Sequence, residues 1–200
     1  MTDSTGSVVL HALRCIGFAE LSRLADAAGL AEPDVESHLI DLAVSGLVTA
    51  EFGAWGLTDA GRVEDARWSA EDLDGRAARW AVSSAFDRFM VLNPELLDLC
   101  SAWHLRTVDG TPAPNDHSDH RYDAQVLDRF IDLDRRVDPV CAELTAARPR
   151  FGRYRHRLTA ALDRARSGAS EYLTDSMDSY HVVWFQLHED LLATLGRARS

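Results

Sequence analysis

The densest group of side chains that could do chemistry lies in a Pro-rich stretch near the middle of this 200-residue chain. Four residues in it could bind a metal ion or a small effector: Asp116, His117, Asp119 and His120. Carboxylates and imidazoles are the ligands that borderline divalent metals prefer. Asp and Asn side chains also cap backbone N–H groups ahead of a helix. The stretch therefore predicts either a ligand site, with the metal unknown, or turn chemistry before a helix near Tyr122, and we favour the second.

A second group lies in the last predicted helix, residues 179–195. His181 and His188 are seven residues apart, about 10.5 Å along a helix axis, which is too far to share one metal ion. Asp178 and His181 are three residues apart and could share one. The alternative, which we favour, is that this helix packs in the core and its histidines bond to buried carboxylates.

The third group is basic. Residues 148–166 hold seven Arg against one acid, with two aromatic residues between them. Such a run could bind phosphate groups or nucleic acid, and the candidate DNA-binding residues in it are Arg153, Arg155 and Arg157. Alternatively, the run neutralises acids of the same molecule or of a dimer mate, which the net charge of −11 favours.

The composition is that of a globular protein without Lys. No apolar run could span a bilayer and no signal peptide is visible, so we expect a cytoplasmic protein. The three cysteines form no CxxC pair and are expected as buried thiols rather than disulfides or zinc ligands. No nucleophile–base motif or phosphate-binding Gly loop is present, so neither an enzyme nor a cofactor is predicted.

Apolar spacing predicts the elements of the first third of the chain. Three helices are expected within residues 9–16, 18–28 and 33–45, the third with Val35, Leu39 and Leu42 buried. Two strands, 47–52 and 55–57, would be joined by a turn at Gly53-Ala54. Thr58 would cap the next helix.

The stretches FAELSRLADAAGL and SHLIDLAVSGLVTAEFGAWGLTDAGR resemble the MarR-type and related winged helix-turn-helix regulators. This resemblance implies that the third helix enters the major groove and that the hairpin reaches phosphates or the minor groove. The groove-facing candidates are Ser37, His38 and Asp41. The sequence departs from the family pattern because no Arg occurs between Arg23 and Arg62, so phosphate contacts would be missing from this face.

The rest of the chain is predicted to be helical, with no strand after the hairpin. Helical stretches are expected from 58 to 89 with a break near Asp74-Gly75, from 93, from 122, over 151–166 and over 179–195. One apolar seam is either bundle core or a short coiled coil: Val126, Phe130, Leu133, Val137, Val140 and Leu144. The stretches PNDHSDHRYDAQVLDRF and DSYHVVWFQLHEDLLATLGR resemble small winged-helix proteins of GC-rich bacteria, which implies a link to phosphoenolpyruvate-utilising phosphotransferases.

The sequence thus predicts a mainly α protein, with a winged helix-turn-helix domain over residues 1–65 and an all-helical dimerisation or effector domain over 66–200. The first functional prediction is a homodimeric DNA-binding transcription regulator whose helical domain senses a ligand. One alternative is a protein-interaction module that docks on and regulates an enzyme, such as a phosphoenolpyruvate-linked one, without binding DNA. The other is a small-molecule or metal sensor.

Overall fold

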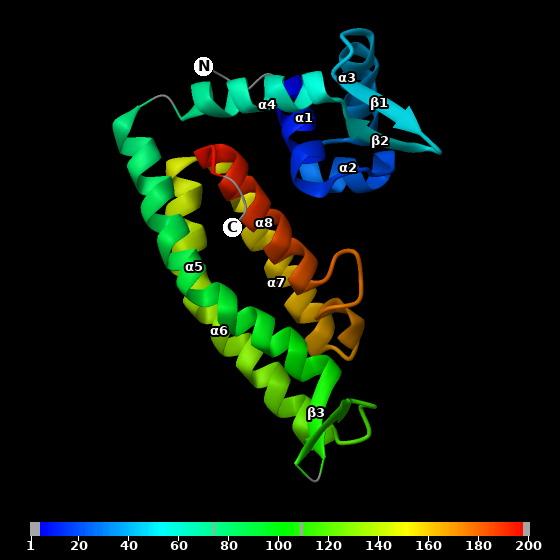
Figure 1. Ribbon diagram of the computed structural model, residues 1–200, viewed down its shortest axis with the longest axis vertical. Coiled ribbons are helices and arrows are strands. Elements are labelled where there is room, and N and C mark those ends of the chain that lie inside the picture. The colour runs from blue at the N-terminus through cyan, green and yellow to red at the C-terminus, as the bar shows by residue number, and fades with distance from the viewer. Residues whose placement is uncertain (1–4, 74, 109, 198–200) are drawn as a thin grey trace. The chain divides into compact units, whose positions relative to one another are not determined.

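The computed structural model describes residues 5–73, 75–108 and 110–197, and it is mainly helical with two short β-hairpins (Figure 1). The chain divides into two compact units. The first unit comprises Met1–Trp80 together with Gln186–Ser200, and the second comprises Ala81–Phe185. The sequence placed the boundary after residue 65 and gave the last helix to the second domain. The difference arises because the unit boundaries fall inside two helices, Arg76–His104 and Tyr180–Leu195.

The first unit begins with three helices, a hairpin and a fourth helix. Their bounds are α1 Thr5–Ile16, α2 Leu21–Ala28, α3 Glu32–Val44, β1 Val48–Glu51, β2 Ala54–Leu57 and α4 Asp59–Asp72. Local sequence explains the ends. Gly29 takes a left-handed conformation after α2, Pro33 lies in the first turn of α3, and the Thr58 hydroxyl accepts a hydrogen bond from Gly61 N at the start of α4.

The hairpin turn lies one residue earlier than predicted. β1 and β2 pair antiparallel, with Glu51 opposite Ala54, so the turn residues are Phe52 and Gly53. Both have positive φ, 52° and 83°, as the type I′ turns favoured in two-residue hairpins require. The prediction of Gly53-Ala54 was wrong because it put the glycine first, whereas glycine here occupies the second turn position.

The core of this unit is formed by apolar side chains from all three N-terminal helices and the hairpin. The predicted stripe of α3 is confirmed, since Val35, Leu39 and Leu42 are buried. α1 contributes Val9, Leu10 and Leu13, all at most 1% exposed. Because α1 contacts α2, α3, α4 and β2, it is the central element of this part of the chain.

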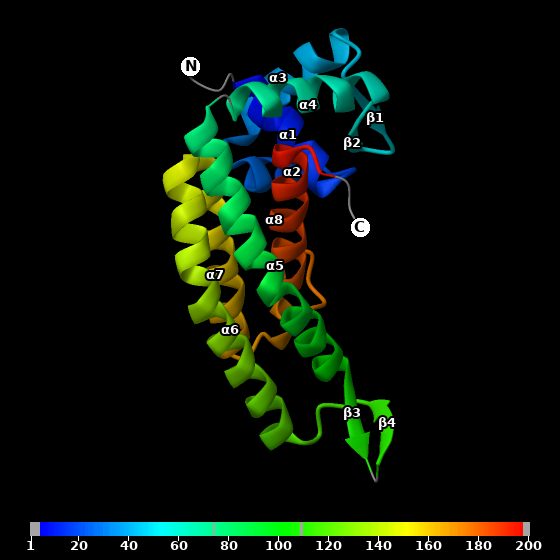
Figure 2. The same ribbon diagram turned by 60° about the vertical axis from the view of Figure 1, so that its left-hand side comes forward.

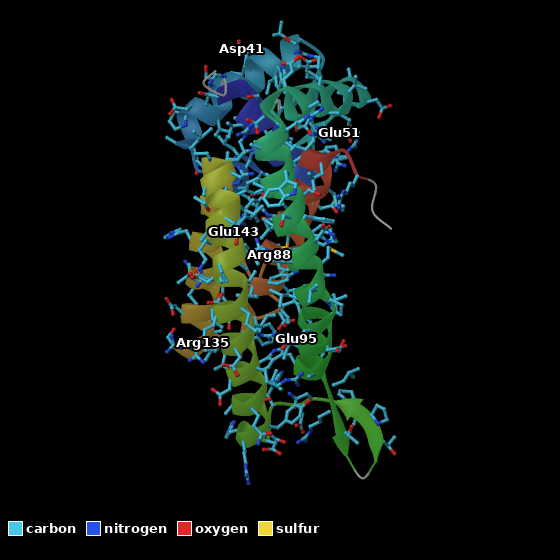
Figure 3. The ribbon with its side chains drawn as sticks, turned by 90° about the vertical axis from the view of Figure 1, so that its left-hand side faces the viewer. Asp41, Glu51, Arg88, Glu95, Arg135 and Glu143 are labelled. Atoms are coloured by element: carbon cyan, nitrogen blue, oxygen red, sulfur yellow. The ribbon has the colours of Figure 1, made fainter. Side chains whose placement is uncertain are left out.

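The second unit is built from long helices that lie side by side (Figure 2). The elements that contribute to it are α5 Arg76–His104, β3 Leu105–Val108, β4 Thr111–Pro114, α6 His120–Ala147, α7 Gly152–Arg166 and α8 Tyr180–Leu195, with short 3-10 turns at Pro149–Phe151 and Ser170–Tyr172. The first residues of α5 and the second half of α8 belong to the first unit. An ion pair between Arg88 and Glu143, both labelled in Figure 3, and another between Glu95 and Arg136 show that α5 and α6 run antiparallel.

Two predictions for this unit were wrong. A hairpin, β3–β4, follows α5 where no strand was expected. Its second strand is the Pro-rich TPAP segment, whose composition indicates a loop. In addition, α5 continues through Pro94, although a new helix was expected to begin at residue 93.

The core of the second unit confirms the bundle interpretation of the apolar seam. All six seam residues of α6 are buried. Trp184 of α8 stacks on Phe89 with ring centroids 4.5 Å apart, and its indole N–H donates to Asn93 Oδ1 at 2.9 Å. No disulfide links the described cysteines, and all three thiols are buried as predicted. Burial raises the pKa of both Cys100 and Cys141 to about 12.

No helix in the described part of the chain combines the length and apolar character needed to cross a membrane.

Candidate functional site

The outward face of α3 is acidic. Asp34, Ser37 and Asp41 are exposed on it, His38 is half-buried, and Glu51 at the end of β1 is also exposed (Figure 3 labels Asp41 and Glu51). Of the three residues predicted to face the groove, Ser37 and Asp41 are therefore exposed and His38 is half-buried. The face can accept hydrogen bonds from amines and guanidinium groups, but it repels phosphate.

Apolar side chains also lie on the surface of α3, which the sequence analysis did not single out. Ile40 and Val44 are 55% and 85% exposed, and their spacing of four residues puts them on one side of the helix. Phe52 at the hairpin tip is fully exposed. Ile40 and Val44 fall outside the buried stripe of Val35, Leu39 and Leu42. Apolar residues off that stripe were the sequence signal for an exposed apolar surface on α3.

The arginines of α7 are engaged with acids and rings of the second unit. Arg155 donates to both carboxylate oxygens of Asp134, at 2.7 and 2.8 Å, and also pairs with Asp138. The guanidinium of Arg153 lies over the Tyr154 ring, 4.9 Å from its centroid. Arg157 lies 3.8 Å from Asp178. These contacts agree with the interpretation in which the Arg run neutralises acids of the same molecule.

The central polar stretch, residues 115–123, uses its side chains for turn and capping contacts. Asp119 Oδ1 accepts from the backbone N–H groups of Arg121 and Tyr122 and so caps α6. Asp116 accepts from the Ser118 hydroxyl and backbone N–H. These bonds from Ser118, with the charge of Arg106, lower the pKa of the Asp116 carboxyl. The capping interpretation explains these contacts without a metal ion.

His117 and His120 are both exposed, but His117 is held in a small network of contacts. The His117 ring contacts Trp103 with centroids 4.7 Å apart, and Nδ1 lies 3.1 Å from Asp123 Oδ2. The buried amide of Asn115 donates to the same Asp123 carboxylate and to the Trp103 carbonyl. His117 also has a positive φ of 57°.

We expect His117→Asn to destabilise the protein by about 1 kcal/mol, because the ring contact and the bond to Asp123 are lost. Asn tolerates a positive φ, so this change tests the ring rather than the backbone. His120→Asn is the matched control and should leave the melting temperature unchanged. Calorimetry with and without a chelator measures both. A loss confined to chelator-free samples would instead favour the metal interpretation.

The residues predicted around the last helix are not brought together as a ligand site. Asp178 is exposed beside Arg157, and His181 is half-buried. Burial, with the charge of His104, lowers the pKa of His181. His188 lies in the part of α8 that belongs to the first unit, whereas Asp178 and His181 belong to the second.

The structure assembles one buried polar cluster that sequence reasoning missed. His11 of α1 lies between two carboxylates of the first unit: Nδ1 is 2.8 Å from Asp65 Oδ1 of α4, and Nε2 is 2.9 Å from Asp190 Oδ1 of α8. All three residues are at most 6% exposed. Ser69 lies 3.4 Å from Nδ1, and Thr194 donates to Asp190 at 3.0 Å.

The surroundings of His11 favour its protonated form. Burial opposes protonation, but the Coulombic effects of Cys15 and Asp190 and the hydrogen bonds to Asp190 and Asp65 outweigh it and raise the pKa of His11 well above its ordinary value. A local signal did exist, because His11 follows the buried Leu10 on a helix that is apolar on most sides. Its partners, 54 and 179 residues away, could not be read from spacing.

Comparison with protein-family models, with curated proteins and with solved structures gave no match.

Proposed function

We propose that residues 5–73 form a winged helix-turn-helix domain whose third helix and hairpin dock on a protein partner instead of reading DNA. The observation that carries this proposal is the surface of α3, where the exposed residues are acidic, small or apolar and none is basic. The chain would regulate its partner, as the docking alternative of the sequence analysis expects.

Electrostatics argue against DNA as the ligand of this face. Residues 1–65 hold 11 acids and 3 Arg, and duplex DNA is bound mainly through cation–phosphate contacts. An acid can accept a bond from a cytosine amino group, but Asp34 and Asp41 supply no phosphate contact.

The chemistry of the surface specifies the partner. Ile40 and Val44 form an apolar pair one helical turn apart, and Glu36 lies one turn before Ile40. Apolar residues at this spacing are the usual anchors of a helix in a groove, and flanking acids favour a basic rim. The partner is therefore a protein with an apolar groove bordered by Arg or Lys.

A second candidate is the homodimeric DNA-binding regulator, which the order helix, helix, helix, hairpin, helix favours. Its affinity would have to come from arginines outside α3, such as Arg153, Arg155 and Arg157. Arg155 already binds two carboxylates, so DNA would have to displace them.

Val44→Ser should weaken partner binding at least about tenfold, the effect of losing roughly 1.4 kcal/mol of anchor contact. Val63→Ser is the matched control, since Val63 is 72% exposed on α4. The partner is captured by cross-linking from the source cells, purified and titrated calorimetrically with both variants. Equal affinities for the two variants would contradict docking through α3.

DNA binding is measured in parallel by anisotropy with genomic fragments at low salt. We expect no binding by the wild type and at most weak, non-specific binding after Asp34→Asn and Asp41→Asn together, because two repulsive charges are removed. Tight, sequence-specific binding by the wild type, lost on changing Arg153, Arg155 and Arg157 to Ala, would establish the second candidate.

A further inference from the structure

We propose that His11, Cys15 and Asp190 form a binding site for one divalent transition-metal ion, Zn²⁺, inside the first unit. This site is separate from the proposed docking surface, and neither proposal depends on the other.

The three potential ligand atoms converge. His11 and Cys15 are four residues apart on α1, so their side chains lie on the same side of the helix, and Asp190 comes from α8. One ligand atom from each residue lies within 4.8 Å of the others. Atoms bound to one tetrahedral zinc lie roughly 3.3–3.8 Å apart, given bond lengths of about 2.0–2.3 Å. Binding therefore requires a contraction of about 1 Å at the widest pair, which side-chain rotation supplies.

The donor set suits zinc rather than a hard cation. An imidazole nitrogen, a thiolate sulfur and a carboxylate oxygen are all zinc ligands, whereas Mg²⁺ and Ca²⁺ bind through oxygen. Among the described residues this is the one group of His, Cys, Asp and Glu with such geometry. The Asp-His stretch, despite its composition, does not converge in this way.

Asp65 occupies the position of a supporting carboxylate. Its Oδ1 lies 2.8 Å from His11 Nδ1, while Nε2 faces Asp190. A metal-binding histidine almost always donates its other ring N–H to a carboxylate or carbonyl, which fixes the tautomer and orients the ring. Asp65 would thus accept a hydrogen bond from the Nδ1–H of His11. The Nε2 lone pair would then be available to the metal.

The exchange of protons for metal is balanced. Binding takes one proton each from His11 Nε2 and from Cys15 Sγ, because zinc is held by a neutral imidazole and a thiolate. Zn²⁺ displaces both, forming the Zn–N and Zn–S bonds while the two protons leave to water.

A nearby buried amide independently indicates a missing donor. Gln186 is 2% exposed, and its Oε1 has no hydrogen-bond partner within the described parts of the chain. It lies four residues before Asp190, hence on the same side of α8. Three protein ligands leave one position of a tetrahedral ion for water, and such a water would offer Gln186 a donor.

The test uses the full chain, free of purification tags, stripped with a chelator and then dialysed against Zn²⁺ or Co²⁺. Elemental analysis should find one zinc per chain in the wild type. The Co²⁺ form should show the near-ultraviolet band of thiolate-to-cobalt charge transfer. Cys15→Ser should abolish the band and the stoichiometric zinc, and circular dichroism verifies that this nearly isosteric variant folds. Cys141→Ser, the matched control at another buried thiol, should retain both.

Asp65→Asn tests the positioning role, since loss of a supporting carboxylate should weaken zinc binding roughly 10- to 100-fold without removing the charge-transfer band. Three results would overturn the proposal. The wild type could bind no stoichiometric metal, the cobalt band could survive Cys15→Ser, or metal binding could be lost on His117→Asn while persisting in Cys15→Ser.

Discussion

Gly61→Ala is expected to destabilise the first unit strongly, although alanine is normally the better helix former by about 1 kcal/mol. Gly61 lies in the first turn of α4 and is buried. A Cβ at this position would overlap the carbonyl oxygen of Leu47, which accepts bonds from the Thr58 N–H and hydroxyl. Because the obstacle is backbone, relaxation would displace the connection from α3 to β1, so we expect a cost of about 3 kcal/mol or more.

Gly6→Ala is the matched control in the same unit. Gly6 is also helical, and the nearest atom to an added Cβ is His38 Nδ1 at 3.7 Å, which is ordinary contact. This change should stabilise the protein by up to about 1 kcal/mol. Denaturant unfolding followed by circular dichroism measures both variants. If Gly61→Ala proves as stable as the wild type, α4 does not pack against Leu47 as described.

Asp134→Ala should be the most damaging single change in the second unit. Asp134 is 8% exposed and accepts both bonds of the Arg155 fork and the bond of the Tyr180 hydroxyl, at 3.1 Å. Burial, followed by the charge of Asp134, raises the pKa of Tyr180 well above its ordinary value, so the phenol remains a donor. Removing the acceptor leaves a fully buried hydroxyl unpaired and Arg155 dependent on Asp138.

We expect this change to cost about 2–4 kcal/mol, toward the lower part of the range for broken buried pairs because the Arg155 side chain is 27% exposed and keeps one partner. Asp132→Ala is the matched control. Asp132 also pairs with an arginine on α6, but both side chains are well exposed, and such pairs contribute little. Thermal unfolding should separate the two variants clearly, and similar melting temperatures would contradict the structural role of Asp134.

The sequence predicted those features that are encoded locally. The buried stripe of α3, the Thr58 cap and the seam of α6 each follow from apolar spacing or from a capping residue within one element. The Asp119 cap of α6 was predicted in the same way, because Asp and Asn side chains ahead of a helix commonly cap its backbone N–H groups. Features that depend on a partner strand or on the surroundings of a side chain were harder to predict from the sequence. The hairpin turn was placed one residue late, and the strand TPAP resembles a loop because its two prolines cannot donate ladder bonds.

The carboxylate partners of His11 could not be predicted from the sequence. Asp65 and Asp190 look like ordinary surface acids of amphipathic helices, and nothing within either helix indicates burial. Their role depends on three helices from opposite ends of the chain meeting in one unit. Spacing rules describe neighbours on one helix, and no such rule relates residues 11 and 190.

The inclusion of Gln186–Ser200 in the first unit has a consequence for biosynthesis. A ribosome delivers the chain in order, so the N-terminal helices emerge long before the segment that supplies Asp190. Until then, His11 and Asp65 lack Asp190, and the first unit cannot be completed while Ala81–Phe185 is being translated. Long-range closure of this kind slows folding and prolongs the exposure of apolar surface. A nonsense mutation at codon 186 would therefore damage a unit most of which is translated much earlier.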